Sequence, residues 1–237
     1  MKILGLDSSG LVASVALIDD NNLLGEYTVN YKKTHSQTLL PMVDTLLGML
    51  EMKPEDIDAI AISAGPGSFT GLRIGSATAK GLGLALKKPL IEVSTLEALA
   101  YQLFGVKDMI CPLMDARRSQ VYTALYHFEE EILVKDMQES ALSIYDIIEE
   151  INKRGRTVAF LGDGLSVYEN IIREHVKVPY MFAPAFSNKQ RAGALAGLGL
   201  VLYKEGKFCH AREHQPNYLR LSQAERERME KEGGMQK

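Results

Sequence analysis

The sequence predicts an α/β protein made of two similar lobes. Its 237 residues correspond to one or two domains of roughly 150 residues each. An apolar fraction of 46% and a charged fraction of 24% are ordinary for a globular chain. The order of elements expected in the first half, β-β-β-α-β-α-β-α, returns in the second half, although the residues themselves do not repeat. This recurrence is the main evidence for two lobes.

The first half begins with three expected strands that form a meander. The first is an apolar run that ends at Asp7, and the second stops at the turn sequence 19–22, DDNN. Pro41 is tolerated only in a first helical turn, which places the start of the next helix near residues 37–40. The expected strands are 2–8, 12–18, 23–31, 58–63 and 89–93, and the expected helices are 38–50, 72–86 and 95–104.

The second half follows the same pattern. Its expected strands are 109–114, 120–128, 131–137, 157–161 and a segment near 178–182, and its expected helices are 143–153, 165–175 and 190–204. Two copies of a ribonuclease-H-like unit with a cleft between them explain this order. We therefore predict lobes at 1–105 and 106–221, followed by a highly charged tail at 222–237 that is expected to be disordered.

The charge balance argues against a chain that binds nucleic acid by itself. The net charge is −3, with 8 Lys and Arg against 11 Asp and Glu in residues 1–105, and 19 against 19 in the rest. The chain has no Trp that would build a conspicuous stacking platform. If it serves a nucleic acid, we expect a partner to hold that nucleic acid.

The sequence also predicts a cytoplasmic protein without a membrane segment. No run approaches the roughly 18 consecutive apolar residues of a membrane helix, and the first residues lack the apolar core of a signal peptide. Cys111 and Cys209 are the only cysteines and lie far apart, so a disulfide framework is not expected.

A possible nucleotide cleft is indicated by small residues at the ends of strands. Asp7 and Ser8 end the first strand, and Asp115 ends its counterpart in the second half. The glycine-rich loop from Gly65 through Gly67 to Gly71 joins a strand to a helix, where free N–H groups suit an anion. Its spacing matches neither the P-loop nor the dinucleotide fingerprint. A phosphate or metal role and a purely structural turn both remain open.

Helices 38–50 and 72–86 carry more apolar and small residues than one sheet face needs. A stripe of small residues four apart in the second helix indicates close approach of another backbone. We predict a protein–protein interface here, with packing on the chain's own sheet as the alternative. The candidate residues are Leu39, Met42, Val43, Leu46, Leu50, Leu72, Gly75, Ala79 and Gly83.

The segment from Cys209 to His214 does not predict a metal site. His210 and His214 are four residues apart beside Cys209, but Pro216 follows and no second ligand group lies nearby, whereas zinc needs three or four ligands. The role of these residues stays open. His35, next to Ser36, lacks the third partner of a nucleophile system.

Several motifs together resemble one family. They are LGLDSS at 4–9, HSQ at 35–37, SAGPGSFTGLRIG at 63–75, MDARRSQVY at 114–122 and PNYLR at 216–220. In these segments the chain resembles the TsaB family, the bacterial accessory subunits of tRNA threonylcarbamoyladenosine biosynthesis, from residue 1 to about 220. The stretch from Gly65 to Gly75 is the most specific part.

The resemblance implies an actin-like ATPase fold and a set of partners. These are the related catalytic subunit TsaD, the ATPase subunit TsaE, and a second copy of the chain bound through the same helices. It implies that the complex transfers threonylcarbamoyl from threonylcarbamoyl-adenylate to N6 of the adenosine 3′ of the anticodon. The chain itself would touch tRNA only indirectly and would carry no cofactor.

One departure from the catalytic relative indicates a non-catalytic role. That relative has a His-x-x-x-His metal motif where this chain reads EVSTLEA at 92–98, so both histidines are absent. The first hypothesis is therefore an accessory scaffold subunit. The alternatives are a stand-alone ATPase or small-molecule kinase that uses Asp7, Gly65–Gly71 and Asp115 in the cleft, and a homodimeric interaction module without a tRNA role.

Overall fold

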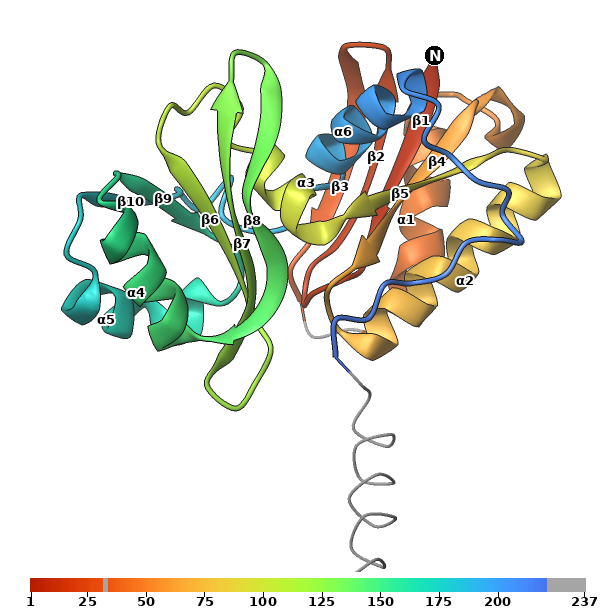
Figure 1. The fold of residues 1–237 in the computed structure, drawn as a ribbon. Helices are drawn as coiled ribbons and strands as arrows, with labels where there is room; N and C mark the ends of the chain where they lie inside the picture. The colour runs from red at the N-terminus through yellow and green to blue at the C-terminus, as the bar shows by residue number, and fades with distance from the viewer. Residues whose placement is uncertain (32–33, 221–237) are drawn as a thin grey trace, which may run out of the picture.

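The computed structural model describes residues 1–31 and 34–220, so the predicted tail at 222–237 lies outside the described residues. Two five-stranded sheets lie side by side (Figure 1). The first sheet has the order β3-β2-β1-β4-β5 and the second the order β10-β9-β6-β7-β8. The strands are β1 Lys2–Asp7, β2 Ala13–Asp19, β3 Asn22–Val29, β4 Ala59–Gly65, β5 Leu90–Ser94, β6 Met109–Asp115, β7 Gln120–Glu129, β8 Ile132–Ser143, β9 Val158–Leu161 and β10 Tyr180–Phe182.

The two sheets repeat one topology, which confirms the predicted fold class. In the first, β1 is antiparallel to β2 and parallel to β4; in the second, β6 is antiparallel to β7 and parallel to β9. The helices are α1 His35–Met49, α2 Phe69–Leu86, α3 Thr95–Tyr101, α4 Ile144–Arg154, α5 Leu165–His175 and α6 Ala192–Lys204, with a short 3-10 turn at Pro54–Asp56.

The first two helices begin earlier than the sequence predicts. Helix α1 starts at His35 and keeps Pro41 inside, at the expense of one backbone hydrogen bond. Burial of its inner face, including Leu39 and Met42, favours the longer helix. Helix α2 starts at Phe69 because the Ser68 hydroxyl caps it by accepting from the Gly71 N–H.

The third helix of each half packs across the predicted lobe boundary. Helix α6 lies on the sheet formed by β1, β2, β4 and β5, on the face opposite α1 and α2 (Figure 1). Helix α3 contacts β6, β7 and β8 of the second sheet as well as β4 and β5 of the first. Residues 192–204 therefore belong to the core of the first sheet, although they follow the second in sequence.

The close approach of α6 to β1 depends on small residues. A Cβ placed on Gly5 would lie 2.6 Å from the carbonyl oxygen of Ala192, and one on Gly199 would lie 2.8 Å from the Cβ of Ala61. Polar groups then fix the start of the helix. Ser14 accepts from the Ala192 N–H at 2.9 Å, and Glu26 accepts from Gly193 at 3.0 Å.

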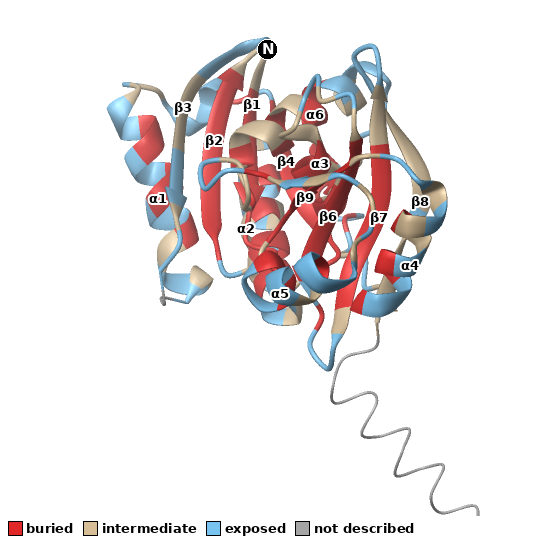
Figure 2. Ribbon diagram, turned by 90° about the vertical axis from the view of Figure 1, so that its left-hand side faces the viewer, coloured by how far each residue is buried: buried red, intermediate tan, exposed pale blue. Residues whose placement is uncertain are grey.

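The buried apolar residues form separate clusters in the two lobes, and a further cluster joins α3 to the second sheet. Central strands β1, β4, β6 and β9 are almost entirely buried, and the outer strands β3 and β8 are half-exposed (Figure 2). No helix in the described part of the chain is long and apolar enough to cross a membrane.

Candidate functional site: the cleft between the lobes

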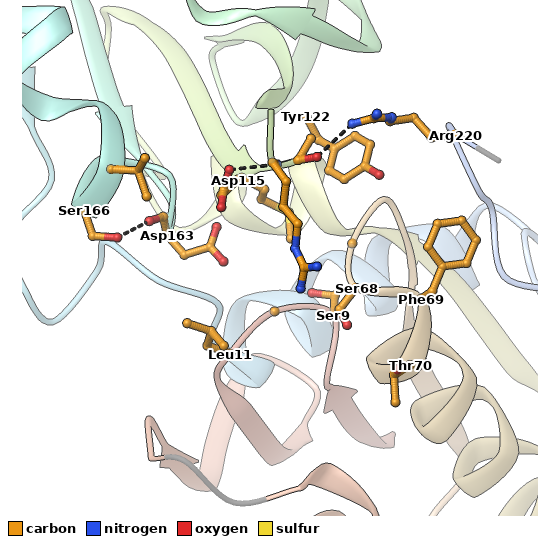
Figure 3. Close-up of a pocket in the computed structure, with 16 residues that line it drawn as sticks. Ser9, Leu11, Ser68, Phe69, Thr70, Asp115, Tyr122, Asp163, Ser166 and Arg220 are labelled. Carbon is orange, nitrogen blue, oxygen red and sulfur yellow. Dashed lines mark hydrogen bonds between the residues drawn. The ribbon is translucent and has the colours of Figure 1, made fainter. Parts of the chain in front are cut away.

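A cleft of about 490 Å³ opens between the two lobes (Figure 3). Its walls come from the β1–β2 turn, the start of α2, the β6–β7 turn and the β9–α5 turn, with the C-terminal segment at one side. The lining residues are Ser9, Gly10, Leu11, Gly67, Ser68, Phe69, Thr70, Met114, Asp115, Ala116, Arg117, Tyr122, Asp163, Ser166, Val167 and Arg220. A ligand in this space would touch both lobes.

Asp7 and Ser8 lie beneath the cleft and hold its floor together. Asp7 is 1% exposed, and its Oδ1 accepts from the N–H and the hydroxyl of Ser9 at 2.9 and 2.7 Å. Burial raises the pKa of Asp7, and the hydrogen bonds from Ser9 oppose that rise. Ser8 donates to the carbonyl of Gly71 at 2.9 Å. Both side chains are thus engaged inside the protein.

The glycine-rich loop packs on the chain's own β1–β2 turn. A Cβ on Gly67 would collide with the carbonyl oxygen of Ser9, and a Cβ on Gly71 with that of Ser8. The Ser68 N–H also donates to the Ser9 carbonyl at 2.7 Å. The glycines therefore permit close backbone approach, as the structural alternative predicts, and part of the loop's face is filled by this turn.

Asp115 and Asp163 meet on the opposite side of the cleft (Figure 3). Asp115 accepts from the Arg117 N–H at 2.8 Å and from the Tyr168 hydroxyl at 3.2 Å. Burial, together with the charge of Asp115, raises the pKa of Asp163 to about 6. Asp163 was not among the residues predicted from the sequence, although its place in a Gly-Asp-Gly turn directly after a buried strand was a usable signal.

The β6–β7 turn is conformationally unusual. Arg117, Arg118 and Ser119 have φ values of 61°, 55° and 57°, which non-glycine residues rarely adopt. Each such residue costs on the order of 1 kcal/mol, and such strain often accompanies binding sites. The turn places Arg117 on the wall of the cleft beside Asp115.

The C-terminal segment, residues 209–220, runs along the first lobe and ends at the cleft. Cys209 forms an antiparallel bridge with Leu90, which covers the edge of β5. Further along, Tyr218 stacks on Phe69 with ring centroids 4.7 Å apart, and Arg220 donates to the Ala116 carbonyl at 2.7 Å. The C-terminal segment thus links the first sheet to the second lobe.

The structure gives the cysteine–histidine segment a packing role. The His214 side chain is fully buried, and its Nδ1 lies 2.6 Å from an oxygen of Glu92. Burial raises the pKa of Cys209 to about 11, so its thiol stays protonated at neutral pH. Within residues 1–31 and 34–220, no group of three or more His, Cys, Asp or Glu has an arrangement that would hold a metal.

The predicted interface residues lie largely inside the chain's own core, which corrects their assignment to a contact surface. One face of the first sheet shares a core cluster with the inner side chains of α1 and with Ala79 of α2. Ser8 packs against Gly75 and Ala211 packs against Gly83, so other parts of this same chain cover both glycines. The residues concerned are Leu39, Met42, Val43, Leu46, Leu72, Gly75, Ala79 and Gly83, all buried, and Leu50, which is partly buried.

The outer face of α1 and α2 exposes different residues. Leu40, Met49 and Leu84 are 53%, 82% and 50% exposed. Gly48 and Gly81 have open space where a side chain would be. The two helices were predictable from the sequence, but the exposed side chains were not, because helical spacing alone does not say which stripe faces the sheet.

The topology and the cleft between the sheets define the class: a two-lobed α/β protein with the actin-like ATPase fold. An activator of 2-hydroxyisocaproyl-CoA dehydratase from Clostridium difficile, solved with bound ADPNP, shares this fold at a TM-score of 0.50 and 12% identity, over 87% of this chain and 97% of the activator. That similarity concerns the fold alone.

More specific similarities identify the family. A family model described as "TsaD: tRNA N6-adenosine threonylcarbamoyltransferase" matches residues 22–228. The tRNA threonylcarbamoyladenosine biosynthesis protein TsaB of Bacillus subtilis (strain 168) is 35% identical over 95% of this chain and 96% of its own length. TsaB of Escherichia coli (strain K12) is 30% identical over 93% of this chain and 95% of its own length.

A solved structure agrees. A Pseudomonas aeruginosa protein described as similar to peptidase YeaZ has a TM-score of 0.77 and 28% identity, over 92% of this chain and 99% of its own. The chain belongs to the TsaB family.

Proposed function

We propose that this chain is a non-catalytic accessory subunit in the biosynthesis of threonylcarbamoyladenosine in tRNA. Its similarity to TsaB proteins over nearly its full length is the observation that carries the proposal. The segment Glu92–Ala98, which replaces the metal-binding histidines of the catalytic relative, supports the non-catalytic part. The near-neutral charge is consistent with a catalytic partner that holds the tRNA.

The outer face of α1 and α2 is the surface we propose for the catalytic subunit, TsaD. The two helices pack against each other and against one sheet face, so their outer sides form one continuous surface. Exposed Leu40, Met49 and Leu84 provide apolar area, and Gly48 and Gly81 let another helix approach closely. The same face would serve a homodimer, since one apolar surface can pair with its own copy. The ATPase subunit TsaE would join the assembled pair.

Gly81→Arg tests the surface. Because nothing lies within 4 Å of a Cβ at Gly81, the substitution leaves the fold intact but places a charged side chain in the proposed contact. We expect loss of co-purification with TsaD and loss of tRNA modification in a reconstituted assay. Asn170→Arg, exposed on α5, is the matched control and should behave like wild type. Normal co-purification of Gly81→Arg would overturn the surface.

The competing role, a stand-alone ATPase or kinase, has the size of the cleft in its favour. Against it, Asp7 and Ser8 are engaged inside the protein, and the glycine loop packs on the β1–β2 turn. Titration of the isolated chain with ATP, with and without magnesium, separates the roles. Turnover by the chain alone would favour the kinase, and binding that requires TsaD would favour the accessory subunit.

A further inference from the structure

Two polar side chains from distant parts of the chain converge on Gly10 at the wall of the cleft. A Cβ placed on Gly10 would lie 2.7 Å from Nε2 of Gln190 and 3.3 Å from Oδ2 of Asp163. Gln190 precedes α6, and Asp163 lies in the turn between β9 and α5. The absence of a side chain at Gly10 is what leaves room for these groups at one point.

In the part of the chain that the structure describes, the Gln190 amide is buried without a partner, and so is one of the two oxygens of Asp163. Gln190 is only 1% exposed, and neither its amide nitrogen nor its amide oxygen has a hydrogen-bond partner among the described residues. Oδ1 of Asp163 is also buried and has none within that part of the chain. An unpaired buried polar group costs on the order of 1–3 kcal/mol, so the unpaired Gln190 amide near an Asp163 side chain that itself has an unpaired oxygen indicates that another group satisfies them.

A second carboxylate adjoins this point. Asp115 and Asp163 both line the cleft, and their side chains lie close together in Figure 3. Oδ1 of Asp115 accepts from Arg117 and Tyr168, whereas its Oδ2 takes no part in these bonds. The charge of Asp115 disfavours ionisation of Asp163, and the charge of Lys189 favours it. Lys189 makes no ion pair with Asp163 among the described residues.

We propose that Asp115, Asp163 and Gln190 bind a hydrated divalent cation of the Mg²⁺ kind at the wall of the cleft. Carboxylate and amide oxygens are the donors that Mg²⁺ prefers, and this ion is usually held by one or two carboxylates with several waters retained. The adjoining cleft of about 490 Å³ has room for those waters. Rotation of the Gln190 amide presents its oxygen instead of its nitrogen.

The donor set also excludes a structural zinc site. Zinc prefers sulfur and nitrogen ligands in a closed tetrahedral shell, and this point offers oxygen donors beside open solvent. A cation between Asp115 and Asp163 would neutralise their repulsion and bridge the turn after β6 to the turn after β9. The proposal concerns the cleft wall and does not rest on the accessory role or on the face of α1 and α2.

Mn²⁺ is the probe for this site, because free and bound Mn²⁺ differ in electron paramagnetic resonance. We expect the full-length chain to bind about one Mn²⁺ that excess Mg²⁺ displaces. Asp163→Asn and Gln190→Met should each weaken binding by about tenfold or more, since loss of even an outer contact of a metal site has effects of that size. Asp146→Asn, an exposed carboxylate on α4, is the control and should leave binding unchanged.

Gly10→Ala provides a second test that keeps both carboxylates. Its added methyl group would occupy the point on which Gln190 and Asp163 converge, so Mn²⁺ binding should again fall, with circular dichroism confirming the fold. The proposal is overturned if the folded wild-type chain shows no saturable Mn²⁺ binding. It is equally overturned if Asp163→Asn and Gly10→Ala both bind Mn²⁺ like wild type.

Discussion

The two lobes share a topology but differ on their outer helices. On α4 and α5 the exposed face is mainly polar and charged, and i,i+4 ion pairs such as Glu169–Arg173, at 2.7 Å, lie along it. On α1 and α2 the exposed face carries Leu40, Met49 and Leu84, interrupted by open glycines. Tyr145 on α4 and Val167 on α5 are also exposed, so the two pairs of helices differ in the ion pairs of one and the open glycines of the other rather than in apolar exposure alone.

The difference shows where one copy of a duplicated fold has been specialised. Both helix pairs bury an apolar stripe against their own sheet, in separate core clusters. The requirement to fold therefore explains the inner faces of both pairs equally well. The outer face of α1 and α2, with exposed Met49 and the open glycines Gly48 and Gly81, needs another explanation, and a protein partner gives one.

The largest expected effect separates the two faces of α2. Gly75→Leu should lower the free energy of unfolding by about 3 kcal/mol or more, because Ser8 Oγ would collide with the new Cβ and Ile62 lies 3.1 Å from it. Gly81→Leu, on the open face of the same helix, should leave stability near the wild-type value. Urea denaturation of both variants measures the difference. Equal losses would contradict the distinction between the faces.

Helices α3 and α6 cross the lobe boundary, and a carboxylate holds each of these crossing helices to the sheet of the other half of the chain. Removal of either carboxylate should have the next largest effect. Glu26 accepts from Arg191 and Gly193 at the start of α6. Glu139 accepts from Ser94 at 2.6 Å and Tyr126 at 3.1 Å, beside the start of α3.

Glu26→Ala and Glu139→Ala should each cost about 2 kcal/mol, since each strands hydrogen-bond donors that face a charged acceptor. Guanidinium denaturation measures the losses. Glu205→Ala, in an exposed pair with Lys207, should have no measurable effect. If the two interior variants resembled this control, the crossing helices would be held by apolar packing alone.

Burial raises the pKa of an aspartate in each lobe. Asp7 accepts hydrogen bonds from Ser9, whereas Asp163 has one oxygen without a partner among the described residues and a pKa raised to about 6. An acid whose pKa is raised on folding binds its proton more tightly in the folded state, so stability falls as pH rises from about 4 to 6.

Asp163→Asn should remove that loss and stabilise the chain by about 1–2 kcal/mol at pH 7.5, with little change at pH 4. The measurement is thermal unfolding across pH in the presence of EDTA, which removes any bound cation. A pH-independent difference between the variant and wild type would contradict the raised pKa.

The order of elements was predictable because apolar periodicity is a local property. Three features were not. Strand β8 runs to Ser143, beyond the predicted end at 137, because half-exposed polar residues such as Ser140 and Ser143 give no strand signal but still pair with β7. Helix α6 covers the first sheet because its backbone approaches Gly5 of β1 closely, and the apolar periodicity of the sequence does not predict this contact. The convergence of Asp163 and Gln190 on Gly10 joins residues far apart in the chain.

The smallest expected effect tests the charged face of the second lobe. Glu169→Ala removes an exposed i,i+4 pair with Arg173 on α5. Such pairs are weak and screened by salt, so the variant should differ from wild type in thermal unfolding only at low ionic strength. Co-purification with TsaD should be unchanged at any salt concentration. A loss of co-purification would mean that the partner also uses α5, and the contrast between the two helix pairs would then reflect two kinds of interface, one apolar and one charged.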